Sequence, residues 1–158
     1  MLALLPRWGP CAVLSADRER PGAPEPAVVA DVLHALTLEA GVLVLDLDRA
    51  ATVAGESVAA VCDAVLVVAP RDLRSVAGIL AVRPRLDAVP AWLLVRGPAP
   101  GGLGTADLSA AVRLPVLGTL PTDRGVTVAL ERGGVPSRGR LARAAARLVG
   151  ALERELGR

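Results

Sequence analysis

The stretch that decides the fold is Val42–Leu47, Val-Leu-Val-Leu-Asp-Leu, followed directly by Asp48-Arg49. Four apolar residues run without a break into Asp46, whereas a strand with one solvated face carries a polar residue at every second position. The run therefore predicts a strand that is buried on both faces of a parallel sheet. Asp46 is expected near the strand's carboxyl end, the edge where open α/β sheets bind ligands. A charge placed at Val44 is then expected to unfold the protein.

Similar apolar runs and helical patterns alternate along the rest of the chain. Further strands are predicted at residues 11–15, 64–69, 91–95 and 115–120. The spacing of apolar residues predicts helices at 27–40, 52–62, 72–82, 126–132 and 137–156. Another short helix is expected to end near Arg113, with Thr105 or Asp107 as its cap. This alternation predicts an α/β fold with a mostly parallel, doubly wound sheet flanked by helices.

The predicted domain organisation is simple. Residues 16–26 are charged and rich in proline, which is typical of a linker. We therefore divide the chain into an N-terminal segment with its linker, residues 1–26, and one α/β domain, residues 27–158.

Composition excludes several classes of protein. Hydrophobic residues make up 53% of the chain and charged residues 22%, which excludes disorder as the main state. The net charge is only +2, all basic residues are arginine, and Trp8 and Trp92 are the only aromatic residues. Nucleic-acid binders concentrate positive charge and stacking aromatics, so no nucleic-acid partner is expected.

The expected cellular location follows from the lack of a membrane-spanning stretch and of a signal peptide in the sequence. No apolar stretch reaches the roughly 20 residues that a membrane span needs, and Met1–Leu5 is too short for a signal peptide. Cys11 and Cys62 are far apart and fit reduced thiols better than a disulfide or a metal pair. We therefore expect a cytoplasmic protein without a metal site.

The glycine-rich loop Gly97–Gly104 lies between a predicted strand and a predicted helix, the position of phosphate-binding loops. The P-loop signature requires Gly-Lys-Ser/Thr, and this chain has no lysine. A structural loop is therefore the favoured interpretation.

The order of the motifs is more specific than any single motif. It resembles the second half of the MinD/ParA group of P-loop ATPases, and most of all its CpaE-like, septum-site-determining branch. The resemblance covers about residues 28–150. It rests on five segments: Val-Leu-Val-Leu-Asp-Leu-Asp-Arg (42–49), Cys-Asp-Ala-Val-Leu-Val-Val-Ala-Pro (62–70), Trp-Leu-Leu-Val-Arg-Gly-Pro-Ala-Pro-Gly-Gly-Leu (92–103), Leu-Pro-Val-Leu-Gly-Thr-Leu-Pro-Thr-Asp (114–123) and Val-Ala-Leu-Glu-Arg-Gly-Gly-Val-Pro (128–136).

This resemblance implies a P-loop NTPase-like fold that is truncated at its N-terminus. It makes Asp46 a Walker B-like carboxylate on the magnesium side of a nucleotide site. It places Arg96, Gly97, Pro121 and Asp123 in loops on the base side. The Gly-Lys-Gly-Gly-x-Gly-Lys-Thr loop of the group does not occur here, so no catalytic residue is assigned. ATP and magnesium are expected only if a P-loop is supplied from elsewhere.

Three functions follow as expectations. The leading one is a non-catalytic or degenerate relative that acts through protein–protein contacts in cell division or in secretion and pilus positioning. Its partners would be the division or secretion machinery or a second copy, and the missing first strand would leave an unpaired sheet edge prone to dimerisation. The alternatives are an active ATPase whose P-loop lies in a missing N-terminal segment, and a membrane-associated scaffold. The scaffold would use the amphipathic C-terminal helix, but its apolar stripe lacks aromatic anchors, which argues against membrane contact.

Overall fold

The computed structural model describes residues 2–15, 19, 24–54, 58–134 and 138–157. The chain divides into two compact units. Unit 1 comprises residues 1–46 and 133–135, and unit 2 comprises residues 47–132 and 136–158. The sequence-predicted division after residue 26 is a different one and stays a prediction.

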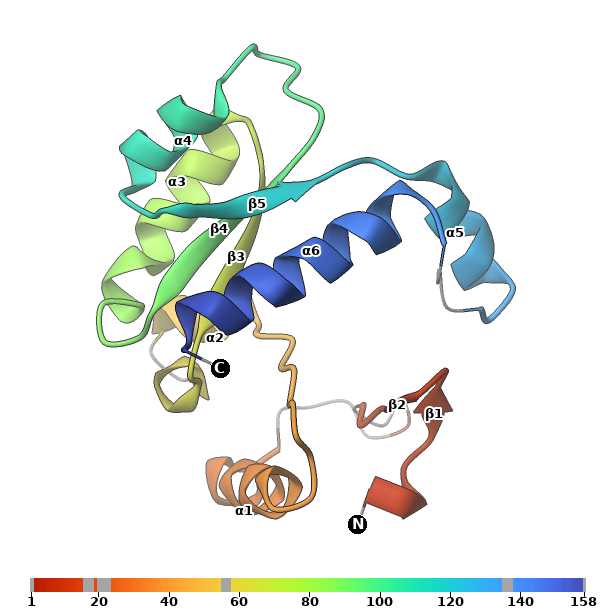
Figure 1. Ribbon diagram of the computed structural model, residues 1–158. Coiled ribbons are helices and arrows are strands. Elements are labelled where there is room, and N and C mark those ends of the chain that lie inside the picture. Colours follow the sequence, from red (N-terminus) through yellow and green to blue (C-terminus); the bar gives the residue numbers. More distant parts are fainter. Residues whose placement is uncertain (1, 16–18, 20–23, 55–57, 135–137, 158) are drawn as a thin grey trace. The chain divides into compact units, whose positions relative to one another are not determined.

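A three-stranded parallel sheet forms the centre of unit 2 (Figure 1). Its strands are β3 (Val65–Pro70), β4 (Ala91–Arg96) and β5 (Val116–Leu120), and β4 lies between the other two. All three were predicted from their apolar runs, to within one residue at each end. The mixed α/β class and the parallel sheet are thus confirmed. Both pairings are parallel because each connection between consecutive strands contains a helix.

One face of the sheet is covered by α3 (Leu73–Val82) and α4 (Thr105–Val112). Asp72 caps α3 by accepting a hydrogen bond from the Ser75 backbone N–H over 2.7 Å. Leu93 of β4 and Leu108 of α4 are completely buried. They belong to one core cluster, completed by Ala69, Ile79, Val95, Val112 and Leu114. A second cluster joins the start of β3 to the end of α3 through Ala59, Val65, Val82, Leu86 and Val89.

The other face of the sheet carries α6 (Arg140–Glu155), which packs against β5. The side chain of Leu148 occupies the space that a Cβ atom on Gly118 would need. Ala144 of α6 is almost fully buried. The predicted amphipathic helix therefore directs its apolar stripe at the sheet. α5 (Arg124–Glu131) connects β5 to the segment before α6.

The predicted helix at 52–62 is divided into two shorter elements in the structure. α2 spans Arg49–Ala54 and a 3-10 helix, η2, spans Val58–Val61. Residues 55–57 between them lie outside the described residues. α2 begins three residues before its predicted start because Asp48 caps it, accepting a hydrogen bond from the Ala51 backbone N–H over 2.7 Å. Another short 3-10 helix, η3 (Arg83–Arg85), follows α3.

Unit 1 contains few interactions that bury apolar surface. It consists of η1 (Leu2–Leu4), a hairpin of β1 (Arg7–Trp8) and β2 (Cys11–Ala12), and α1 (Pro26–Thr37). The predicted strand at 11–15 is thus reduced to two residues, and most of the predicted linker lies outside the described residues. Pro26 suits the first position of α1 because an N–H at that position would have no acceptor within the helix, so proline loses no hydrogen bond. Leu36 is the one buried residue of that helix.

The prediction of a doubly buried strand at Val42–Leu47 is wrong for this structure. The segment forms no strand, and the exposed fractions of Val42 and Val44 are 80% and 87%. A buried strand needs a neighbour for its backbone and helices for its faces. No described strand pairs with these residues, because β3, β4 and β5 pair only with one another. The apolar sequence of residues 42–47 does not determine whether another strand pairs with this segment.

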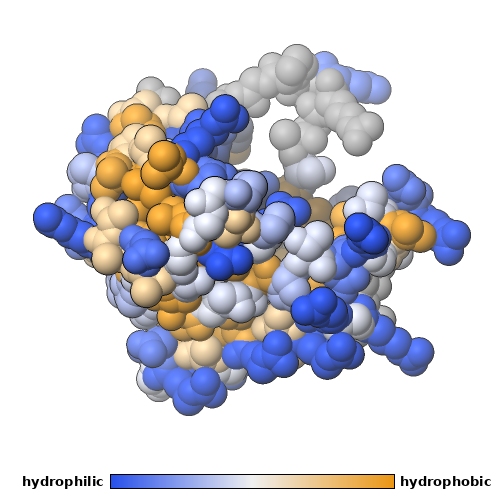
Figure 2. Space-filling view, turned by 90° about the horizontal axis from the view of Figure 1, so that it is seen from above, coloured by the Kyte–Doolittle hydropathy of each residue, from blue (hydrophilic) through white to orange (hydrophobic). Residues whose placement is uncertain are grey.

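Apolar side chains remain at the surface in both units, for example Leu38, Leu73 and Val149. Figure 2 shows hydrophobic residues lying among strongly hydrophilic ones on the face that it presents. None of the helices in the described part of the chain has the length and hydrophobicity to cross a bilayer.

Candidate functional site

The candidate site lies at the carboxyl ends of β4 and β5. Arg96 and Leu120 are partners in the register of these strands, so their following loops start side by side. Two hydrogen bonds then join the loops. The Gly97 N–H donates to the Leu120 carbonyl over 3.4 Å, and the Thr122 hydroxyl donates to the Gly97 carbonyl over 3.2 Å. The parallel topology thus brings together two loops that are about 25 residues apart in sequence.

A cavity of about 240 Å³ opens between these loops. It lies at the edge where open α/β sheets bind ligands. Its walls come from the ends of all three strands and the first residue of α4: Arg71, Val95, Gly97, Thr105, Thr119, Leu120 and Pro121. We call it the strand-end cavity.

Arg71 gives the strand-end cavity its charge. The Nε atom of Arg71 is buried and has no hydrogen-bond partner in the part of the chain that the structure describes. A buried donor without an acceptor costs free energy, and an anionic or carbonyl ligand would relieve that cost. The hydroxyls of Thr105 and Thr119 add two more hydrogen-bonding groups.

The side chains that line the strand-end cavity carry one guanidinium and two hydroxyl groups, and the others are apolar. Its lining residues include no His, Cys, Asp or Glu, and these are the side chains that usually act as general bases or nucleophiles. Among the described residues, no group of three such side chains is placed to hold a metal ion.

The glycine-rich loop Gly97–Gly104 leads into α4, and its purely structural role stays a prediction. α4 begins directly after it, and Asp107 accepts a hydrogen bond from the Gly104 N–H over 3.2 Å. The residue before the helix is therefore Gly104, while Asp107 contributes from the first turn. A carboxylate at this helix terminus complements the helix dipole that a phosphate would otherwise use.

The structure brings two of the predicted site residues together, Gly97 and Pro121, in the walls of the strand-end cavity. Arg96 is the exposed last residue of β4, next to Gly97. Asp46 belongs to unit 1, where it is exposed and lies in no strand. Its predicted role on the magnesium side stays a prediction.

Asp123 has a clear structural role. One carboxylate oxygen accepts from the Gly125 N–H over 3.1 Å and caps α5, and the other accepts from the Leu141 N–H over 3.2 Å at the start of α6. These backbone hydrogen bonds, first from Leu141 and then from Gly125, hold the pKa of the Asp123 carboxyl below its usual value. A Cβ on Gly139 would stand 2.6 Å from this carboxylate, and the φ of +109° at Gly139 also favours glycine. A direct contact of Asp123 with a nucleotide base stays a prediction.

Sequence reasoning missed Arg71, Thr105 and Thr119 as parts of the site. A usable signal existed for two of them. Arg71 is the first residue after β3, and Thr105 is the first residue of the helix that follows β4. Both positions face the ligand-binding edge in a parallel sheet. Thr119 lies inside β5, and the apolar pattern of that strand does not distinguish it.

The comparisons with known proteins find relatives but no described family. No family model matches the chain, and no solved structure matches it. Two similar curated proteins come from Mycobacterium tuberculosis: "Uncharacterized protein MT3760" of strain CDC 1551 / Oshkosh and "Uncharacterized protein Rv3660c" of strain ATCC 25618 / H37Rv. Each is 35% identical over 157 residues, which cover 96% of this chain and 44% of the relative. The chain therefore spans less than half the length of the curated relatives that it matches.

Proposed function

We propose that this chain is a degenerate MinD/ParA-like protein of the CpaE-like, septum-site-determining type. It has no ATP turnover of its own and acts in the cytoplasm through protein–protein contacts, in cell division or in secretion and pilus positioning. The ordered motifs support the family. The parallel sheet and the strand-end cavity, whose walls include Gly97 and Pro121, fit a P-loop NTPase-like arrangement.

The free edge of β3 carries the proposal that the protein works by contact. Within the described residues β3 pairs only with β4, so its other edge presents unpaired N–H and C=O groups. Leu66 and Val68 on this strand are 36% and 55% exposed. Soluble proteins usually protect such edges with charges, and Val65–Pro70 contains none.

We assign the free edge to a second copy of the chain. An uncharged strand can pair antiparallel with its own copy across a twofold axis, because no like charges then face each other. Such pairing would extend the sheet to six strands and place side chains of the second copy beside Leu66 and Val68.

Light scattering coupled to size-exclusion chromatography tests this contact. We expect wild-type protein to dimerise as its concentration rises, and Val68→Lys to remain monomeric because a charge on the edge strand opposes pairing with another strand. Val149→Lys is the matched control, since Val149 is similarly exposed but lies on α6. A wild-type chain that stays monomeric at every concentration, or a Val68→Lys variant that dimerises like wild type, would overturn the assignment.

One observation favours the alternative of an active ATPase. The curated relatives are more than twice as long as the region that matches, which leaves room for a P-loop outside these 158 residues. In that case the strand-end loops would form the base side of a nucleotide site in the longer protein. ATP hydrolysis by a longer version of the protein, and none by the 158 residues, would support this alternative.

The membrane-scaffold alternative finds less support. The apolar stripe of α6 packs on β5 through Ala144 and Leu148. A helix that must insert into a bilayer needs this stripe free. Membrane contact would therefore require α6 to leave the sheet.

A further inference from the structure

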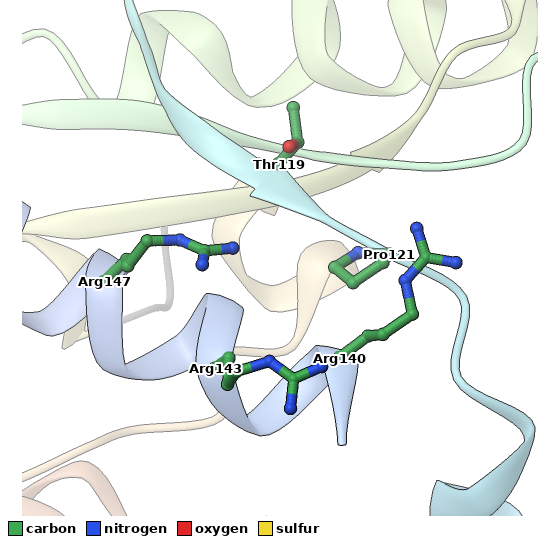
Figure 3. A pocket seen from close by; sticks show the side chains of 5 residues that line it. All are labelled: Thr119, Pro121, Arg140, Arg143 and Arg147. Atoms are coloured by element: carbon green, nitrogen blue, oxygen red, sulfur yellow. The ribbon is translucent and has the colours of Figure 1, made fainter.

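A second cavity, of about 310 Å³, lies between β5 and α6. Its walls are Thr119, Pro121, Arg140, Arg143 and Arg147. Figure 3 shows the three arginine side chains on successive turns of α6, with the guanidinium of Arg140 extending past Pro121. We call these five residues the arginine pocket.

The arginines line one pocket because of their spacing. Side chains three and four residues apart lie on the same face of a helix, and Arg140, Arg143 and Arg147 follow this spacing. The packing of Ala144 and Leu148 on the sheet fixes the rotation of α6. The arginine face is consequently held beside the carboxyl end of β5.

The arginine pocket concentrates positive charge without matching carboxylates in its walls. Its lining includes no Asp or Glu, and in the described chain no ion pair joins any of the three arginines to an acid. Asp123 is the carboxylate whose pKa responds to Arg140, although backbone hydrogen bonds lower that pKa more. The three arginines are exposed and their guanidinium groups point in different directions (Figure 3), so their charges are hydrated and available to a bound anion.

The chemistry of the lining narrows the class of ligand. Guanidinium groups bind phosphate oxygens through paired, charge-assisted hydrogen bonds. Thr119 contributes to the wall formed by β5, but its side chain points away from the arginines (Figure 3). The volume suits a small molecule, and no aromatic side chain lines the pocket for base stacking.

We infer that the arginine pocket binds a small soluble ligand bearing at least two phosphate groups, such as an inorganic or organic diphosphate. The inference is independent of the P-loop and of the β3 edge, so it stands or falls separately from the proposed function. The pocket shares Thr119 and Pro121 with the strand-end cavity. A ligand in the arginine pocket would therefore also influence the strand-end loops.

Titration calorimetry of the 158-residue protein with inorganic pyrophosphate at low salt tests the inference. We expect saturable binding to wild type, and at least a tenfold loss of affinity in Arg143→Ala/Arg147→Ala. Arg143→Lys/Arg147→Lys should show an intermediate loss, because lysine keeps the charge but not the paired geometry. Arg154→Ala is the matched control, since Arg154 is exposed on the same helix but outside the pocket, and it should bind like wild type. Melting curves check that each variant is folded.

Two comparisons distinguish the source of the phosphate. Pyrophosphate should bind much more tightly than monophosphate, and vesicles of phosphatidylglycerol should not retain the protein at physiological salt. No pyrophosphate binding by wild type, an equal loss in Arg154→Ala, or retention on vesicles without binding of free pyrophosphate would each overturn the inference.

Discussion

The carboxylate of Asp123 accepts a hydrogen bond from the backbone N–H of Leu141 over 3.2 Å, across 18 positions of sequence. Its other oxygen caps α5 at Gly125. One side chain thereby fixes the starts of two helices, and α6 is the helix that carries the arginine pocket. The carboxylate stabilises the geometry of the pocket without lining it.

Asp123→Asn is expected to lower the melting temperature at neutral pH by a few degrees, because the amide keeps one acceptor oxygen and one of the two N–H groups loses its partner. Since the pKa of Asp123 is lowered in the folded state, its stabilising effect is complete above the ordinary value of 3.8 and is lost as the pH falls through the lower folded pKa. Melting curves of variant and wild type should therefore converge in acid. Glu153→Gln on α6 serves as the control, and a Tm difference that does not depend on pH would contradict the assignment.

The contact between Gly118 and Leu148 predicts a compensating pair of substitutions. Gly118→Val should destabilise the protein by about 1–3 kcal/mol, because the added carbons meet the Leu148 side chain. Leu148→Ala alone removes a packing contact and should also destabilise. Denaturant unfolding of the double variant should reveal less destabilisation than the sum of the single changes. If the free-energy changes of the two single variants simply add in the double variant, the contact between α6 and β5 at these residues is contradicted.

Leu93 and Val44 should respond in opposite ways to substitution. Leu93 is fully buried at the centre of β4, so Leu93→Ala should cost about 2–5 kcal/mol. Val44 is exposed, so Val44→Asp should leave the melting temperature of the protein close to that of wild type. This replaces the expectation from sequence that Val44→Asp unfolds the protein. Unfolding by Val44→Asp would restore the buried-strand hypothesis.

Nucleotide binding by the 158 residues should be weak. The P-loop amides and lysine that hold a triphosphate in this group are absent from the sequence. In Arg143→Ala/Arg147→Ala, which lacks the arginine pocket, we expect no phosphate release from Mg-ATP and a dissociation constant no better than roughly 1 mM. Calorimetry and a phosphate-release assay measure the two quantities. Micromolar Mg-ATP binding that Asp46→Ala abolishes would contradict the degenerate assignment.

The sequence by itself determined the strands of the sheet and most of its helices. Apolar runs such as Ala91–Arg96 are local patterns, and this run is buried because β4 has a neighbouring strand on each side. Asp72 is likewise a local signal, because a helix cap acts on the next turn of the same chain. Gly97 and Pro121 were assigned to the site through the resemblance to the MinD/ParA group, and both directly follow strands of the sheet.

Only the tertiary structure decided which segments pair with a strand and which helix faces pack against the sheet. Val42–Leu47 has the pattern of a buried strand but lies exposed, because burial requires a neighbouring strand that the pattern does not encode. Similarly, Arg140, Arg143 and Arg147 look in the sequence like a solvated helix face. They become a pocket because Ala144 and Leu148 pack α6 on the sheet and turn that face toward Thr119. Hydrophobic pattern is a local property, whereas pairing and charge convergence depend on contacts between residues distant in sequence.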